Sequence, residues 1–356
     1  MGVWPLRFCF GFHSRIDCQP ANLAESARAS ACRQPCSQAL TTKPLPASLL
    51  TAAMLAGLLL HSMATAATAA STSNSANESA AASATIKRMR ENGEIVLGYY
   101  DNNPPFSYVN QHAKVMGYSI DISDQIISHL AATLKMPFLA TRLVPITLQN
   151  RFAMVQNGHI DLECTTSTHI RAREKMVAFS NTIFVSSMRI LTRKEGPIRE
   201  IADLRRKTVV VIGNTRAEAL LNRISQQQDL QINMLSTHDR DVAPLTILQT
   251  GHADAYLDDD AVLYGTLSKT WRPKDWLITG KAEAHEAYGC TMAANDAYLK
   301  QLVDEAIADL MRSGKALQLY AKWFQSPIPP NGINLQFPAS EQMQFLYHNP
   351  NDKAFE

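Results

Sequence analysis

The sequence predicts an α/β protein divided into two lobes, each built from strands that alternate with helices. From Ile86 onward, short β-branched runs alternate with stretches in which apolar residues recur at helical spacing. This alternation is typical of sheets whose strands are largely parallel. The segment 194–197 interrupts the pattern, and a second series of strands and helices follows it. A chain of 356 residues is long enough for a targeting segment and two such lobes.

Residues 1–69 are predicted to be a leader with a signal peptide. The apolar run at 47–60 is short for a membrane span but suits the hydrophobic region of a signal peptide, and A-x-A cleavage sites follow it. The segment before this run is long for a signal peptide, so we expect the true start to lie well after Met1. The Ser- and Ala-rich stretch at 70–84 is predicted to be a linker.

Lobe 1 is predicted to comprise 85–190 and 290–356, with lobe 2 at 191–289 between them. A T-x-x-E capping box starting at Thr215 fixes the beginning of one lobe 2 helix. A strand at 286–292 is predicted to return the chain to lobe 1. Other strands are expected at 94–99, 138–144, 160–164, 187–192, 208–212 and 253–257, and helices at 86–92, 121–134, 147–156, 215–224, 244–250 and 299–310. A single helical turn is expected at 201–204, after the crossing between the lobes.

A cluster of hydroxyl residues followed by an arginine is the strongest candidate for a binding site. The hydroxyl run at 165–168, which includes Thr166 and Thr168, directly follows a short apolar strand, and Arg173 comes next. Small hydroxyl donors and a planar guanidinium suit a carboxylate held by paired hydrogen bonds. The alternative is a hydroxyl-rich loop that caps the next helix, with Arg173 solvated on its surface.

The same stretch carries a longer pattern, G-x-x-D, a hydroxyl cluster and R-x-x-x-x-x-F-S, filled by Gly158, Asp161, Thr166, Thr168, Arg173, Phe179 and Ser180. It resembles the ligand loop of periplasmic amino-acid-binding proteins of ABC importers. Similarity to the glutamate/aspartate-binding members extends over 145–151, 179–184, 258–263, 286–290 and 322–330. The resemblance implies a two-lobed periplasmic binding protein-like fold with hinge strands between the lobes. Such a protein closes on an amino acid and delivers it to an inner-membrane ABC permease. We expect a periplasmic monomer without a cofactor.

The resemblance also assigns roles to single residues. Arg173, Thr168 and Thr166 would bind the α-carboxylate, and Asp259 would accept from the α-ammonium group, unless it only caps the next helix. Thr215 and Arg216 lie at a helix N-terminus whose free N–H groups suit an anion, although a plain capping box is equally consistent.

The side-chain pocket departs from the glutamate/aspartate binders. Tyr100 stands where they have an arginine, and Leu148 where they have a serine. The helical arginine that holds the distal carboxylate is retained as Arg151, while Arg240 replaces a histidine and Arg216 a hydroxyl residue. Positive charge in the cleft is therefore not reduced, and an acidic ligand is still expected. Arg151 and Arg240 could instead be solvated surface residues, and Tyr100 could mark a non-acidic ligand.

Other functions find little support in the sequence. A net charge of +2, with no basic run interleaved with aromatics, argues against nucleic-acid binding. There is no G-x-S-x-G, P-loop or H-E-x-x-H motif, and the aspartates at 258–260 lack the spacing of a calcium loop. The enzymatic alternative is a dehydratase of the same fold with Glu163 or Asp259 as general acid, which would need paired groups of separated pKa.

Two of the six cysteines, Cys164 and Cys290, would remain after removal of the leader. One ends the strand before the hydroxyl run and the other lies on the returning strand, so the two could be neighbours. We expect a disulfide between them in an oxidising compartment, the alternative being two buried thiols.

Overall fold

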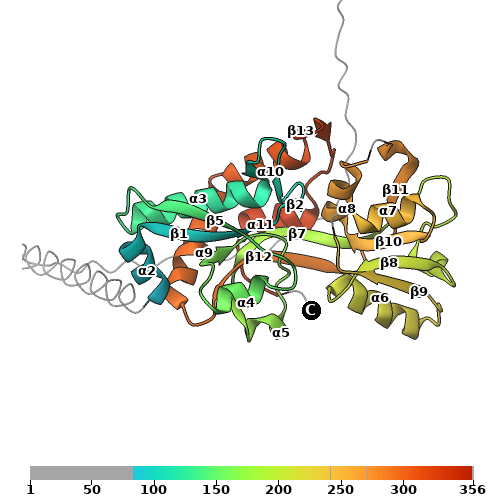
Figure 1. The fold of residues 1–356 in the computed structure, drawn as a ribbon, viewed down its shortest axis with the longest axis horizontal. Helices are drawn as coiled ribbons and strands as arrows, with labels where there is room; N and C mark the ends of the chain where they lie inside the picture. The colour runs from blue at the N-terminus through green and yellow to red at the C-terminus, as the bar shows by residue number, and fades with distance from the viewer. Residues whose placement is uncertain (1–82, 241, 271, 355–356) are drawn as a thin grey trace, which may run out of the picture. The chain divides into compact units, whose positions relative to one another are not determined.

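The computed structural model describes residues 83–240, 242–270 and 272–354 (Figure 1). The predicted leader and the linker up to residue 82 lie outside the described residues. No helix within the described ranges is long and apolar enough to cross a membrane. The first described helix, α2 (Ala84–Asn92), is capped by Ser83, whose hydroxyl accepts the N–H of Ile86 and donates to Asp296 at 2.7 Å. The chain is thus fixed to the folded part from Ser83 onward.

Nine strands of the described chain form one mixed sheet in the order β5-β1-β6-β12-β7-β10-β8-β9, with β11 added beside β7. β1 is parallel to β5 and β6, and β8 is parallel to β9 and β10. The strands are β1 (Glu94–Tyr99), β5 (Ala140–Pro145), β6 (Leu162–Glu163), β7 (Val177–Arg193), β8 (Thr208–Ile212), β9 (Asn233–Thr237), β10 (Ala255–Asp259), β11 (Trp276–Thr279) and β12 (His285–Ala293). The predicted alternation of strands and helices, with parallel strands in each half, is confirmed.

Two long antiparallel strands, β7 and β12, join the halves of this sheet (Figure 1). From Val177 to Ser187, β7 pairs with β12, and from Met188 to Arg193 it pairs with β10 and β11. We call the half with β1, β5 and β6 lobe 1, and the half with β8 to β11 lobe 2. β7 and β12 are the hinge strands that the predicted fold requires.

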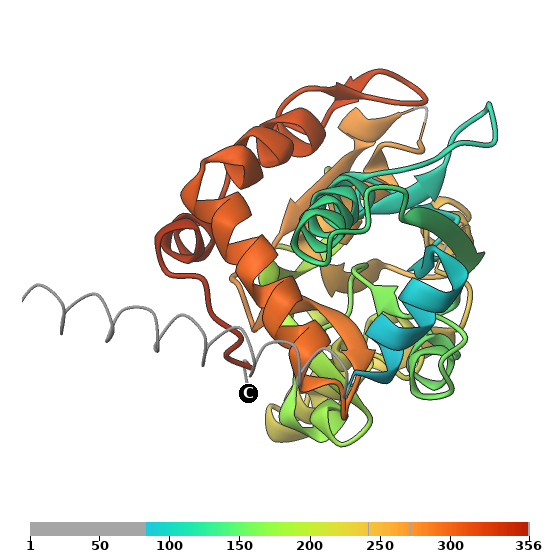
Figure 2. The same ribbon diagram turned by 90° about the vertical axis from the view of Figure 1, so that its left-hand side faces the viewer.

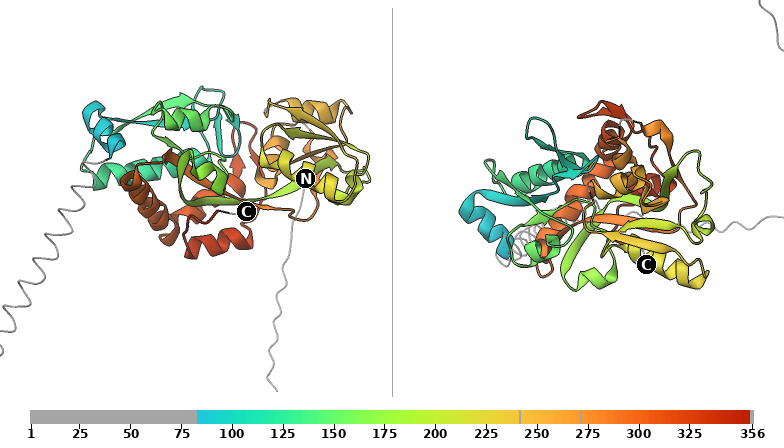
Figure 3. Two further views of the ribbon diagram at one scale, coloured as in Figure 1. Left: turned by 90° about the horizontal axis from the view of Figure 1, so that it is seen from below. Right: turned by 45° about the vertical axis from the view of Figure 1, so that its right-hand side comes forward.

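Lobe 1 is built around aromatic residues between the sheet and its helices. Phe106 makes edge contacts with Tyr118, Phe184 and Phe324 at centroid distances of 6.2, 4.9 and 5.6 Å. Figure 2 shows α9 crossing in front of the lobe 1 strands, and Figure 3 shows the C-terminal helices on the same lobe. The helices are α3 (Tyr118–Thr133), α4 (Arg151–Gln156), α5 (Arg171–Glu174), α9 (Ala297–Arg312), α10 (Lys315–Phe324) and α11 (Glu341–His348).

Lobe 2 encloses β8 on both faces, which explains the unbroken β-branched run of that strand. Val209 and Val211 pack with residues of α6 (Arg216–Gln227), while Val210 and Ile212 pack with residues of α7 (Ala243–Gln249). The helical turn predicted after the lobe crossing is present as η1 (Ile201–Leu204). A second short turn, η2 (Pro273–Asp275), leads into β11.

One helix, α8 (Asp260–Leu267), contacts both lobes. Its Ala261 and Val262 belong to the lobe 1 core, whereas Leu263 belongs to a lobe 2 core. Gly265 lies against the turn after β2 (Asn102–Asn103), so closely that a Cβ there would overlap the carbonyl oxygen of Pro104. β2 forms a small sheet with β3 (Ser107–Val109) and β4 (Val115–Met116), and β13 (Pro327–Ile328) pairs with β14 (Ile333–Asn334) in the C-terminal segment.

Candidate functional site

The hydroxyl run lies in a loop between β6 and α5, which we call the hydroxyl loop (165–169). The returning strand β12 holds this loop through its backbone. The N–H of Gly289 donates to the Ser167 carbonyl at 3.1 Å, and the N–H of His169 donates to the Ala287 carbonyl at 2.7 Å. Thr168 forms an isolated antiparallel bridge with Tyr288. The loop is therefore placed at the point where the chain re-enters lobe 1.

Glu163 and the disulfide brace the hydroxyl loop from below. The Glu163 side chain is fully buried, and its carboxylate accepts from the Thr165 N–H at 2.8 Å, the Thr165 hydroxyl and the Thr291 hydroxyl at 2.8 Å. Cys164, which follows Glu163, and Cys290, which precedes Thr291, form the predicted disulfide and are 126 residues apart in sequence. Glu163 thus supports the loop rather than facing an open site.

Two lobe 1 arginines face the hydroxyl loop. Arg173 donates to the Thr168 carbonyl at 2.8 Å, and Arg151, 5% exposed, donates through Nε to the Ser167 hydroxyl at 2.9 Å. Their Cζ atoms lie 5.3 and 4.2 Å from the centre of the Phe152 ring, so both guanidiniums contact the same aromatic side chain. Burial, together with the Arg151 guanidinium, lowers the pKa of Arg173 to about 10. Among the described residues, no carboxylate forms an ion pair with either arginine.

Asp259 ends β10 at the start of α8, as predicted, but its carboxylate does not cap the helix. The capping alternative is therefore wrong. One carboxylate oxygen accepts from the Tyr288 hydroxyl, and the other is buried with no hydrogen-bond partner among the described residues. Burial raises the pKa of Asp259 well above its ordinary value, and the carboxylates of Glu286 and Asp258 raise it further. A buried acceptor of this kind suits a cationic donor.

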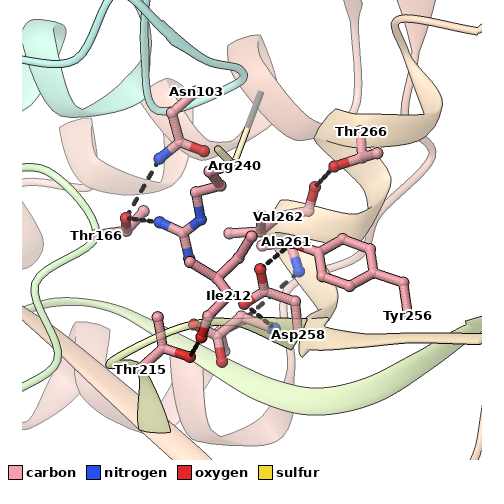
Figure 4. Close-up of polar contacts among 12 residues, drawn as sticks. Asn103, Thr166, Ile212, Thr215, Arg240, Tyr256, Asp258, Ala261, Val262 and Thr266 are labelled. Carbon is pink, nitrogen blue, oxygen red and sulfur yellow. Dashed lines mark hydrogen bonds and ion pairs between the residues drawn. The ribbon is translucent and has the colours of Figure 1, made fainter. Parts of the chain in front are cut away.

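Thr215 and Arg216 lie at the start of α6. The Thr215 hydroxyl donates to the Ile212 carbonyl at 2.6 Å (Figure 4). It also accepts the Glu218 N–H at 3.4 Å. The Glu218 carboxylate accepts from the N–H of Asn214 instead of Thr215, so only half of the predicted capping box forms. Arg216 donates through Nε to the fully buried carboxylate of Glu286 at 2.9 Å.

Arg240 reaches from lobe 2 to the hydroxyl loop of lobe 1 (Figure 4). One guanidinium nitrogen donates to the Thr166 hydroxyl at 3.1 Å, and another lies 3.4 Å from the carboxylate of Asp258. The side chain is 12% exposed, so Arg240 is not the solvated surface residue that the sequence left open. Asn103 donates to the same Thr166 oxygen at 3.2 Å.

A cavity of 140 Å³ adjoins these contacts. Its lining includes Tyr100, Asn103 and Leu148 from lobe 1, with His238 and Arg240 from lobe 2. Burial raises the pKa of Tyr100 above its ordinary value. The cavity thus lies at three of the positions where the sequence departs from the glutamate/aspartate binders: Tyr100, Leu148 and Arg240.

The structure brings all the predicted site residues to the region where β7 and β12 join the lobes, and it adds residues that sequence reasoning missed. Asp258 and Glu286 are buried partners of Arg240 and Arg216, so these two positive charges are compensated within the protein. Both carboxylates lie in segments already matched to the family, but no local pattern in the sequence indicates which arginines they pair with. Within the described residues, no cluster of His, Cys, Asp or Glu could hold a metal ion.

Two lobes on a shared pair of strands, with charged and hydroxyl side chains from both meeting at the joint, define a protein of the two-lobed solute-binding class. The chain belongs to the bacterial extracellular solute-binding proteins, family 3, whose family model matches residues 95–326. This membership confirms a solute-binding protein, as the sequence predicts, rather than an enzyme.

Relatives of known name are similar over most of the chain. It is 41% identical over 274 residues to the glutamate/aspartate import solute-binding protein of Escherichia coli K12, covering 77% of this chain and 90% of the relative. It is 38% identical over 275 residues to the L-glutamate/L-aspartate-binding protein of Pseudomonas aeruginosa, covering 77% and 91%. Among solved structures, a mutant of the arginine-binding protein of T. maritima matches with a TM-score of 0.59 at 23% identity, covering 68% and 99%. That structural likeness supports the fold alone.

Proposed function

We propose that this protein binds glutamate or aspartate between its lobes and delivers it to an ABC permease of the inner membrane. The observation that carries the proposal is a set of unmatched charges. Arg151 and Arg173 have no carboxylate partner among the described residues, and one oxygen of Asp259 has no hydrogen-bond partner there. An acidic amino acid carries the complementary set, two carboxylates and one ammonium group.

The two arginines receive different parts of this ligand. Arg173, with the hydroxyls of Thr166 and Thr168, binds the α-carboxylate, and Asp259 accepts from the α-ammonium group. Arg151 binds the distal carboxylate through guanidinium positions that Ser167 and Leu148 do not occupy. Because Arg216 and Arg240 already face carboxylates, they shape the site without adding to its net positive charge. Thr215 and Tyr100 complete the walls.

The relatives support the same assignment. The E. coli and Salmonella typhimurium relatives, each 41% identical, are named glutamate/aspartate import solute-binding proteins. We further propose that the protein is a periplasmic monomer, exported by a leader at 1–69 that is cleaved before the linker. Lobe 1 then comprises 85–190 with 290–356, and lobe 2 comprises 191–289. Ligand contacts from both lobes favour a closed state through a hinge motion of β7 and β12.

A non-acidic amino acid is the second candidate. Tyr100 and Leu148 line the cavity beside Arg151 and replace an arginine and a serine of the glutamate/aspartate binders, which reduces the polar contacts open to a distal carboxylate. An amide or aromatic side chain would suit this wall better than a carboxylate.

Titration calorimetry of the mature protein with glutamate, aspartate, glutamine, arginine and leucine separates the two candidates. We expect glutamate or aspartate to bind most tightly and to raise Tm, since a ligand at a hundredfold excess over Kd adds about 2.7 kcal/mol to the free energy of unfolding. Tighter binding of glutamine, arginine or leucine would overturn the acidic assignment.

A further inference from the structure

The hydroxyl of Thr166 accepts two hydrogen bonds, and this determines what it can offer a ligand. Asn103 donates through Nδ2 at 3.2 Å, and Arg240 donates through a guanidinium nitrogen at 3.1 Å (Figure 4). A threonine hydroxyl has two acceptor positions and one O–H donor. Both acceptor positions are occupied, so the remaining capacity of Thr166 is its proton. Among the described residues, no acceptor is recorded for that proton.

Both donors are themselves fixed. Asn103 is 5% exposed and lies in β2, which is part of a three-stranded sheet. Arg240 is held from behind by Asp258, 3% exposed. The Asp258 carboxylate in turn accepts from the Tyr256 hydroxyl and, at 2.9 Å, from the N–H of Asp259. An arginine so held always donates, because a guanidinium has no acceptor.

We propose that Asn103 and Arg240 are positioning residues that direct the Thr166 hydroxyl proton into the cleft, so that Thr166 recognises a hydrogen-bond acceptor such as a carboxylate oxygen. The inference rests on the proposed function, because it takes the cleft as the ligand site. Thr166 and Asn103 belong to lobe 1, whereas Arg240 belongs to lobe 2. The second donor therefore reaches Thr166 only when the lobes are together, and closure fixes Thr166 as a donor at the moment when ligand is enclosed.

The decisive variant is Asn103→Asp, which is nearly isosteric but replaces the Nδ2 donor by an acceptor. The Thr166 proton then has an acceptor within the protein and turns away from the ligand. We expect the Kd for L-glutamate, measured by calorimetry, to rise at least tenfold. Asn103→Ala only removes a donor, so a smaller rise, about threefold, is expected. The adjacent substitution Asn102→Asp adds the same charge in the same strand and is the matched control, with a change below threefold.

A double-mutant cycle separates the proton from simple charge repulsion. In a Thr166→Val background there is no proton to redirect, so Asn103→Asp should raise the Kd by less than threefold. A tenfold effect in both backgrounds, or equal effects of Asn103→Asp and Asn102→Asp, would overturn the inference. Circular dichroism and Tm of each variant confirm folding, and Asn103→Ala provides the comparison if Asn103→Asp unfolds.

The failure of the proposed ligand would look different. If L-glutamine bound and L-glutamate did not, the same cycle measured with L-glutamine would still show the coupling between Asn103 and Thr166. That result would overturn the acidic ligand and support the inference about Thr166. If L-glutamate bound but the effects of the Asn103 and Thr166 substitutions on its Kd were additive, the acidic ligand would be supported and the inference about Thr166 would be overturned.

Discussion

The two lobes hold their cleft arginines in opposite ways. In lobe 1, Arg151 and Arg173 are held by neutral oxygens of Ser167, Leu148 and Thr168. In lobe 2, Arg216 and Arg240 face the buried carboxylates of Glu286 and Asp258. A guanidinium that is bonded only to neutral oxygens keeps its full attraction for a ligand anion, whereas a guanidinium paired with a carboxylate loses most of that attraction. Residue type alone therefore does not tell which arginine binds a ligand.

The part of the site in lobe 1 is supported by a disulfide, and removing this disulfide should have the largest effect. Replacing Cys164 and Cys290 by alanine releases a loop closed over 126 residues. In the loop-entropy model this lowers the free energy of unfolding by up to about 5 kcal/mol. Urea unfolding of the oxidised protein and the double variant measures the difference, and dithiothreitol should not change the variant further. Equal stability of the two proteins would contradict the brace.

Removing Arg173, which is bonded to a neutral carbonyl oxygen, should have the next largest effect. Arg173→Ala takes the partner of the α-carboxylate out of a closed cleft, and we expect a loss of about 2–5 kcal/mol of binding free energy for every amino acid bound. Lys175→Ala, at the exposed residue that follows the same helix, is the matched control. Near-normal affinity of a folded Arg173→Ala protein in calorimetry would show that the two lobes do not differ in the proposed way.

Arg151→Ala should act more selectively. Because Arg151 is assigned to the distal carboxylate, its removal should cost glutamate about 1.5–3 kcal/mol while leaving glutamine nearly unchanged. The ratio of the two Kd values, before and after substitution, is the measurement. A parallel loss for both ligands would instead place Arg151 at the α-carboxylate.

The smallest expected effect is a pH dependence that arises from Asp259. Burial raises the pKa of this carboxyl above its usual value of about 4, and only its ionised form attracts an ammonium group. Affinity for glutamate should thus increase with pH through the Asp259 pKa, by at most tenfold per unit. Stability of the free protein should change in the opposite direction: the folded pKa exceeds the unfolded one, so ionisation costs the folded state.

Calorimetry across pH tests this dependence, and Asp259→Asn should remove it. Burial also raises the pKa of Glu286, so Glu286→Gln is needed as a second control. A dependence that survives Asp259→Asn and disappears in Glu286→Gln would assign the titration to lobe 2's ion pair.

Much of the fold could be predicted from local pattern. The strand at 94–99, the β-branched strand at 208–212 and the turn at 201–204 form with the predicted bounds. The hinge strand β7 begins well before the predicted strand at 187–192. The prediction missed this first part because Ser180 and Asn181 interrupt its apolar pattern. The structure satisfies them elsewhere: Ser180 accepts the Cys290 N–H at 2.9 Å, and Asn181 bonds to Asp304.

The site was less predictable, since its pairings depend on distant residues. Arg216 and Glu286 are 70 positions apart, and Arg240 and Thr166 are 74 apart. No local spacing announces such contacts. The resemblance to the glutamate/aspartate binders found the arginines, but only the packing of the two lobes distinguishes those facing a carboxylate from those that do not.

The close approach of Gly265 to Pro104 means that a substitution at 265 would change the contact between α8 and the turn after β2. A single methyl group at 265 would act as a wedge between α8 and the turn after β2, with no charge added and no ligand-contacting side chain removed. The glycine is therefore a position at which the contact between α8 and this turn can be changed without altering the charge or polarity of the cleft.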